Sequence, residues 1–155
     1  MHRPRRSILA RENGLTLTEM MIGVVLVTIL VSATTTRIGP VLTRSSAGQA
    51  ATLVALDLEQ AVSLASRQRR PVRVACDCAN GRYTITDRTN GTVLFNRVLT
   101  GEAGGFGLTG LTFSTAQIDV FPSGQTSAPL TVSLTANNVT RQVSMSTGGF
   151  VRVIR

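Results

Sequence analysis

The feature that most constrains this 155-residue chain is an apolar run near its N-terminus with one carboxylate at its start. The run is Met20–Val31, and Glu19 comes directly before it. A charge at a membrane-spanning segment is unfavourable without a partner, so an ionisable residue there is a functional candidate by default. Counted from Leu15, the apolar segment has about 17 residues, which is the lower limit for crossing ~30 Å of hydrocarbon. Small residues extend it, and the sequence predicts a transmembrane helix over 15–37.

The residues before this helix have two interpretations. In the first, residues 1–14 are a leader that is removed after Gly14, and the apolar helix stays as an anchor. In the second, the apolar run belongs to a secretory signal peptide that is cut after Val31-Ser32-Ala33, which releases a soluble β-domain. Arginines before Gly14 place the N-terminus in the cytoplasm in both cases. A secretory signal has no use for a carboxylate near its apolar core, so the sequence favours the leader.

Helical periodicity continues after the apolar run. Pro40 predicts a kink or a short break, because proline removes one helical hydrogen bond. Beyond it, two neighbouring apolar stripes follow spacings of three and four. The first stripe is Leu53, Leu56, Gln60 and Leu64, and the second is Val54, Leu58, Ala61 and Ala65. The residues expected largely on the polar side are Thr52, Asp57, Glu59, Ser63 and Ser66. Basic residues followed by Pro71 predict the helix end, so 38–70 is expected to be an exposed amphipathic part of the helix.

The remaining residues, 71–155, predict a β-rich globular head. Alternating apolar and polar residues between Asn-Gly and Asn-Asn turns predict six or more antiparallel strands. The expected strands are Val72–Cys76, Arg82–Thr86, Thr92–Phe95, Ile118–Phe121, Leu130–Leu134, Gln142–Met145 and Phe150–Ile154. The glycine-rich stretch 101–110 predicts a loop. The predicted fold class is α+β, with a long N-terminal membrane-spanning helix packed by a C-terminal antiparallel β-sheet head.

The composition offers little for catalysis or metal binding. The only histidine is His2 in the predicted leader, and the only cysteines are Cys76 and Cys78. This set is too small for a structural zinc site, which usually takes four ligands. No paired carboxylates or phosphate-binding loop stand in a recognisable frame, so we predict no enzyme, no metal and no cofactor. The cysteines are interpreted either as small buried thiols or as a disulfide in an oxidising compartment.

The segment Gly14-Leu15-Thr16-Leu17-Thr18-Glu19, followed by an apolar helix, resembles the class III signal of type IV pilins and pseudopilins. Three later pieces extend the resemblance over nearly the whole chain: Arg69–Cys76, Phe121–Gly124 and Ser146–Arg152. Each piece is weak alone, and their order gives them weight. Together they are similar to the GspH/FimT-like group of minor pseudopilins and minor type IV pilins.

This resemblance implies a pilin-like structural subunit at or near the tip of a type II secretion pseudopilus or a type IV pilus. It implies cleavage between Gly14 and Leu15 by a prepilin peptidase and N-methylation of Leu15. It assigns Glu19 to assembly, in contact with the N-terminal amine of a neighbouring subunit. The implied partners are the peptidase, the membrane and other pilins or pseudopilins in a helical fibre. The implied location is the cytoplasmic (inner) membrane, as a single-pass protein with its head outside the cytoplasm and with incorporation into the fibre.

One departure from the group leaves an alternative function open. Members that bind DNA during uptake carry Gly-Arg-x-Arg near the C-terminus, and Phe150 stands here in place of the first arginine. We expect this apolar side chain to pack rather than to meet phosphate. Arg152 and Arg155 remain as candidate phosphate contacts, although charges on an edge strand also discourage aggregation. The formal net charge is +8, and removing four arginines and one glutamate with residues 1–14 leaves about +5. The alternative is therefore a DNA-binding minor pilin for natural transformation.

Overall fold

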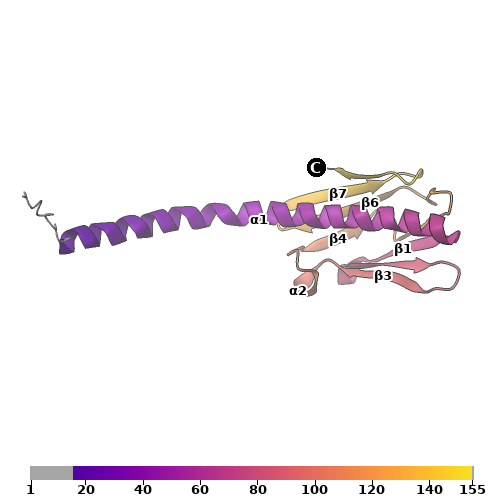
Figure 1. Ribbon diagram of the computed structural model, residues 1–155, viewed down its shortest axis with the longest axis horizontal. Helices are drawn as coiled ribbons and strands as arrows, with labels where there is room; N and C mark the ends of the chain where they lie inside the picture. Colours follow the sequence, from indigo (N-terminus) through magenta and orange to yellow (C-terminus); the bar gives the residue numbers. More distant parts are fainter. Residues whose placement is uncertain (1–15, 155) are drawn as a thin grey trace, which may run out of the picture. The chain divides into compact units, whose positions relative to one another are not determined.

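The computed structural model describes residues 16–154, with the side chains of residues 33–42 left out of the description. The chain divides into two compact units, Met1–Ile38 and Gly39–Arg155. Its elements in order are α1 (Leu17–Gln68), β1 (Val72–Asp77), η1 (Cys78–Asn80), β2 (Arg82–Asp87), β3 (Val93–Val98), α2 (Gly101–Gly104), β4 (Gly110–Phe113), β5 (Gln117–Val120), β6 (Leu130–Ala136), β7 (Val139–Met145) and β8 (Val151–Ile154). The predicted α+β class is confirmed (Figure 1).

In the first unit, apolar side chains of α1 are exposed on every side. Leu17 is 78 % exposed and Leu30 is 68 % exposed, and the large apolar residues between them are all more than half exposed. Among the described residues, no helix combines the length and the hydropathy that a membrane crossing requires. The predicted transmembrane span over 15–37 is therefore not confirmed.

Helix α1 continues through Pro40. The short break predicted there is wrong. A proline removes its own N–H donor and crowds the carbonyl four residues earlier, but it leaves the other hydrogen bonds of the ladder in place. The helix assignment therefore runs without interruption from Leu17 to Gln68.

In the second unit, two four-stranded antiparallel sheets replace the single sheet that the sequence analysis envisaged. Their strand orders are β3-β2-β1-β5 and β4-β6-β7-β8. Predicted hairpins are confirmed at three Asn-containing turns: Val74 pairs with Ile85 across β1 and β2, Ile85 pairs with Phe95 across β2 and β3, and Val132 pairs with Val143 across β6 and β7. The C-terminal part of α1 lies along strands of both sheets (Figure 1). A helix that faces two sheets gives them a common core.

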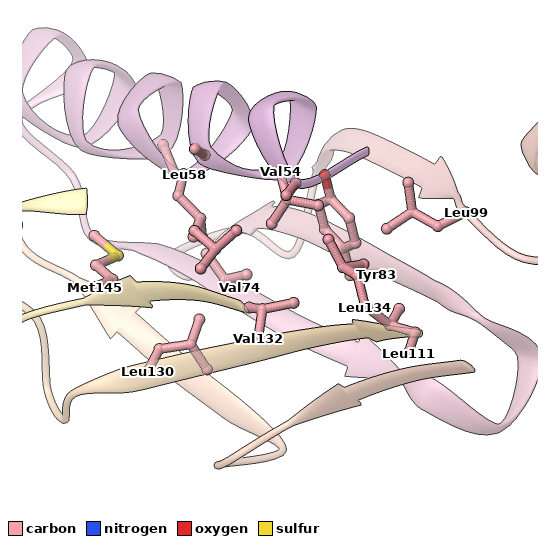
Figure 2. Close-up of a cluster of buried hydrophobic side chains, with 14 of the residues drawn as sticks. Val54, Leu58, Val74, Tyr83, Leu99, Leu111, Leu130, Val132, Leu134 and Met145 are labelled. Carbon is pink, nitrogen blue, oxygen red and sulfur yellow. The ribbon is translucent and has the colours of Figure 1, made fainter. Parts of the chain in front are cut away.

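The core of this unit forms where one stripe of α1 meets the inner faces of the sheets. Val54, Leu58, Ala61 and Ala65, the second predicted stripe, are all fully buried. Figure 2 shows Val54 and Leu58 pointing from the helix toward side chains of both sheets, among them Val74 and Val132. The first stripe is less buried, and Leu56 remains 55 % exposed. Within the described part of the chain, all the buried apolar residues lie between Ala47 and Met145, so the second unit contains its own core.

The predicted end of α1 is confirmed: the helix stops at Gln68, three residues before Pro71. Arg69 follows with a φ of 53°, in the left-handed region that glycine or asparagine usually occupies after a helix. Pro71 then cannot continue the helix, and β1 begins at Val72.

The predicted loop over 101–110 is wrong at both ends. The short helix α2 occupies its start, and β4 begins at Gly110 and was not predicted. Leu111 of β4 pairs with Leu134 of β6, and the side chains of both are buried. Four residues are too few to show alternation clearly, and the partner strand lies about twenty residues further along the chain.

Candidate functional site

The N-terminal signal contains a helix-capping arrangement that the sequence analysis missed. Thr16 precedes the first residue of α1 and donates from both its backbone N–H and its hydroxyl to Glu19 Oε2, each at 3.1 Å. In return, the backbone N–H of Glu19 donates to Thr16 Oγ1 at 3.4 Å. This reciprocal pair is a capping box, and its signature is Thr-x-x-Glu. Glu19 thus stabilises the start of its own helix, in addition to any role in assembly.

Three of the predicted site residues, Gly14, Leu15 and Arg155, lie outside the described residues. The cleavage point and the methylation site therefore stay predictions. Residues 16–19 are the part of the signal that the structure describes.

The two cysteines are joined in the structure. Cys76 at the end of β1 and Cys78 in η1 form a disulfide across the connection to β2. Asp77 between them accepts hydrogen bonds from Asn80 Nδ2 and, at 2.7 Å, from Arg82 Nε. These bonds lower the pKa of Asp77, with Asn80 as the main cause. The bonds and the disulfide together hold the β1–β2 connection in one conformation.

A buried polar triad ties α1 to the first sheet, and the sequence analysis missed it. Asp57, placed there on the polar side, is only 4 % exposed. Tyr83 on β2 donates its hydroxyl to Asp57 Oδ2 at 2.5 Å, and Arg97 on β3 donates to both Asp57 oxygens at 2.9 and 3.0 Å. Burial first, and then Asp57, raises the pKa of Tyr83 well above its ordinary value. The carboxylate is satisfied on both oxygens, so it is a structural contact.

Two of the motif pieces meet at the C-terminal end of α1. The turn that contains Phe121–Gly124 accepts a hydrogen bond from Ser66 Oγ at the Pro122 carbonyl, at 3.2 Å. The β7–β8 turn packs so closely against this turn that a Cβ at Gly149 would collide with the carbonyl oxygen of Gly124. Gly149 has a φ of 78°, which also favours glycine. Gly149 is therefore required by close backbone approach in the head and does not mark a ligand site.

The third piece, Arg69–Cys76, contributes an ion-pair network on the first sheet. Arg73 Nε donates to Asp119 Oδ1 at 2.8 Å, and Arg88 approaches the other oxygen of Asp119 at 3.4 Å. Arg70 lies 3.6 Å from the buried carboxylate of Asp87. Arg73 is thus held by hydrogen bonding to Asp119, which raises its pKa. The pieces Arg69–Cys76, Phe121–Gly124 and Ser146–Arg152 all have structural roles.

The C-terminal strand differs from expectation. Phe150 is 80 % exposed, so the prediction that it packs is wrong. It stands directly before β8, where its backbone carbonyl accepts a hydrogen bond from the Ser146 N–H. Arg152 is exposed on β8, opposite Ser144 of β7, and forms no ion pair within the described residues.

The described residues offer no metal site, since no three His, Cys, Asp or Glu side chains gather there. A groove of about 900 Å³ runs between α1 and the edge of the second sheet, and its walls are largely apolar. The exposed helix, its capped N-terminus and the two-sheet head offer surfaces for packing and binding.

Comparisons with known proteins agree with this architecture. The family model of the type II transport protein GspH matches residues 50–149. The type IV minor pilin FimU of Pseudomonas aeruginosa has the same fold, with a TM-score of 0.58 and 16 % identity over 72 % of this chain and 90 % of that one. The minor pseudopilin EpsH of the type 2 secretion system of Vibrio cholerae gives a TM-score of 0.57 and 20 % identity over 70 % and 96 %.

No curated protein matches the chain at a significant level. The family match nevertheless covers most of the chain and includes all the buried residues of the sheets. The GspH/FimT-like resemblance of the sequence is confirmed by this match and by the pilin-like folds of the two solved structures. The chain belongs to the GspH family of type II transport proteins and is a pilin-like structural subunit, not an enzyme.

Proposed function

We propose that this chain is a minor pseudopilin that is made as a precursor, cut between Gly14 and Leu15, and methylated on Leu15. It then joins other pilins or pseudopilins at or near the tip of a type II secretion pseudopilus or a type IV pilus. The observation that carries the proposal is the exposed apolar helix that begins at Leu17, where Thr16 and Glu19 form its cap. Apolar surface of this extent favours burial, either in lipid or against neighbouring helices.

The same helix would anchor the protein in the inner membrane before assembly. Residues 20–31 carry no charge, and four arginines lie before residue 15. Positive charge is retained on the cytoplasmic side, so the head would stand outside the cytoplasm as a single-pass protein. Basic residues before the helix and a self-contained head after it support this orientation.

Glu19 would have two successive roles. In the isolated subunit its carboxylate caps α1 through Thr16. In the fibre, the carboxylate would pair with the new amine of Leu15 on a neighbouring subunit, since a buried charge is far less unfavourable beside an opposite one. The two roles make different demands: the cap needs only hydrogen bonding, whereas the pair needs negative charge.

Substitution of Glu19 separates these roles. Glutamine serves at this position of a capping box, so Glu19→Gln keeps the cap and removes the charge, whereas Glu19→Ala removes both. We expect both variants to be cut and neither to co-purify with the partner pilins at the normal level. Co-purification of Glu19→Gln at the wild-type level would show that the carboxylate acts only as a cap.

Processing is tested at the glycine. Gly14→Val should leave the full-length precursor in the membrane fraction, and the intact mass of the wild-type protein should match a chain that begins at N-methylated Leu15. A soluble wild-type chain that begins after Ala33 would instead establish the secretory interpretation and remove Glu19 from the mature protein.

A DNA-binding minor pilin is the second candidate. One observation favours it: exposed Phe150 lies two residues from exposed Arg152, and an aromatic ring beside a cation suits stacked bases and phosphates. Arg155 would add a further phosphate contact. Gel shifts at low and high salt test it, and a salt-sensitive complex that Arg152→Gln weakens is the expected result.

A further inference from the structure

The second sheet ends in an open edge beside an apolar groove. Strand β8 pairs with β7 and with no other strand of the described chain. The groove of about 900 Å³ has one wall on α1, formed by Gln49, Leu53 and Leu56 among others, and the other at Val153 of β8. Leu56 is 55 % exposed and Val153 is 38 % exposed. An uncovered edge strand with apolar neighbours is a site where another strand can add.

The backbone of β8 has unused hydrogen-bonding groups on its outer side. Ser146 N–H donates to the Phe150 carbonyl at 2.9 Å, which makes this a hydrogen-bonded pair. Such pairs alternate along antiparallel strands, so Arg152 exchanges bonds with Ser144 while Val151 and Val153 direct their N–H and C=O groups away from β7. Those outward groups match what an added strand needs.

The charge around the edge selects the partner. Arg141 of β7 lines the groove, and Arg152 is exposed on β8. Neither forms an ion pair within the described residues. A second copy of this chain in the same place would bring like charges together, which is unfavourable across paired strands. An acidic strand would be attracted instead.

We propose that the groove between α1 and β8 receives an extended segment of a partner subunit, which adds a strand to the second sheet. Its apolar side chains alternate with carboxylates: the apolar ones cover Leu53, Leu56 and Val153, and a carboxylate meets Arg141. The apolar walls favour a polypeptide over a nucleic acid here. This contact goes beyond helix packing in the fibre and does not involve Glu19.

The test uses the full chain in detergent micelles and a fluorescent, end-blocked peptide that alternates valine and glutamate, followed by fluorescence anisotropy. Val153→Pro removes one outward N–H and leaves the bonds to β7, since proline is tolerated on an edge strand. Val153→Thr is the matched control, because it keeps the N–H and the β-branched shape. We expect Val153→Thr to bind like the wild type and Val153→Pro to bind about tenfold more weakly, which corresponds to ~1.4 kcal/mol.

A second variant keeps the test decisive even where Val153→Pro fails to fold. Arg141→Glu leaves the strand edge intact and should reverse the charge preference. We expect this variant to bind the valine–glutamate peptide more weakly than the wild type does and to bind a valine–lysine peptide more tightly. Equal binding of Val153→Pro and wild type, or of both peptides to wild type, would overturn the proposal. So would an absence of binding, a dimer that Val153→Pro abolishes, or displacement of the peptide by duplex DNA. Because Glu19→Ala should bind the peptide normally, failure here is distinguishable from failure of the assembly proposal.

Discussion

Tyr83 is a buried residue whose hydroxyl group forms a hydrogen bond with a charged side chain. Its side chain is fully buried, and its hydroxyl donates to Asp57, which Arg97 also holds. Arg97 is about one-third exposed, so its charge can reach water while the carboxylate stays inside. The arrangement avoids an unpaired buried charge, which is the costly case for a helix that must bury Asp57. It also fixes the rotation of α1 on the first sheet.

This triad predicts how stability depends on alkaline pH. Tyr83 is neutral when protonated, and its folded pKa is raised, mainly by burial, above the unfolded value of about 10. The unfolded state therefore releases the proton first, so the contribution is fully present below pH ~10 and the free energy of unfolding falls as pH rises above it. We expect no tyrosinate absorbance from the folded chain at pH ~10 and its appearance together with loss of circular dichroism.

The measurement is clean because Tyr83 is the only tyrosine and the chain has no tryptophan. The chain unfolded in denaturant is the control and should titrate near the ordinary value. Tyrosinate that forms in the folded chain near that value, with the circular dichroism unchanged, would contradict the burial of this hydroxyl.

At the scale of elements, the helix shows what periodicity can and cannot predict. The stripe Val54, Leu58, Ala61 and Ala65 was predicted from spacing alone and is fully buried. The neighbouring stripe has the same spacing but borders the groove, and Leu56 stays exposed. The spacing defines an apolar face of the helix. How much of that face is buried depends on where the sheets end.

This difference predicts unequal effects of the same substitution. Leu58→Ala removes a fully buried side chain and should lower the free energy of unfolding by about 2–5 kcal/mol. Leu56→Ala, two residues earlier on the same helix, should change it by less than ~1 kcal/mol, because most of that side chain is already in water. Denaturant unfolding of both variants measures the contrast, and equal destabilisation would mean that the helix packs with a different face toward the sheets.

The same reasoning explains which parts of the fold were predicted. Hairpins such as β6–β7 follow from local turn chemistry, since Asn137 takes a positive φ of 51° in the turn. The division into two sheets does not follow from local turn chemistry, because β5, the second partner of β1, comes only after three intervening strands. Asp57 was placed in solvent for the same reason: its partner Arg97 is 40 residues away. Contacts at such separation leave no periodic signal in the sequence.

The sequence could indicate only those parts of the candidate site that consist of consecutive residues. The roles of Gly14, Leu15 and Glu19 were predicted from consecutive residues and stay predictions, and the capping box that the structure adds at Thr16 was readable in the same stretch. The groove beside β8 was not predicted, because α1 and β8 stand about a hundred residues apart along the chain. Sites built from consecutive residues can be read from a sequence, whereas sites built by packing need the fold.

For the whole molecule, the division of the chain separates two kinds of apolar surface. The second unit buries apolar surface in a core whose described members lie between Ala47 and Met145. The first unit exposes apolar side chains along α1 from Leu17 to Val31. A domain with a complete core can fold alone, whereas an exposed apolar helix needs a partner or a lipid phase.

This division predicts opposite behaviour of two chains. Residues 39–155 alone should be soluble and should unfold in one cooperative transition, because every buried apolar residue that the structure describes lies between Ala47 and Met145. The full chain should partition into lipid vesicles, with its head giving a transition of similar midpoint. Vesicle flotation and thermal unfolding by circular dichroism measure both properties. A fragment 39–155 that fails to fold would show that the head depends on the preceding helix, and a full chain that stays out of the vesicles would mean that the exposed helix is reserved for other subunits of the fibre.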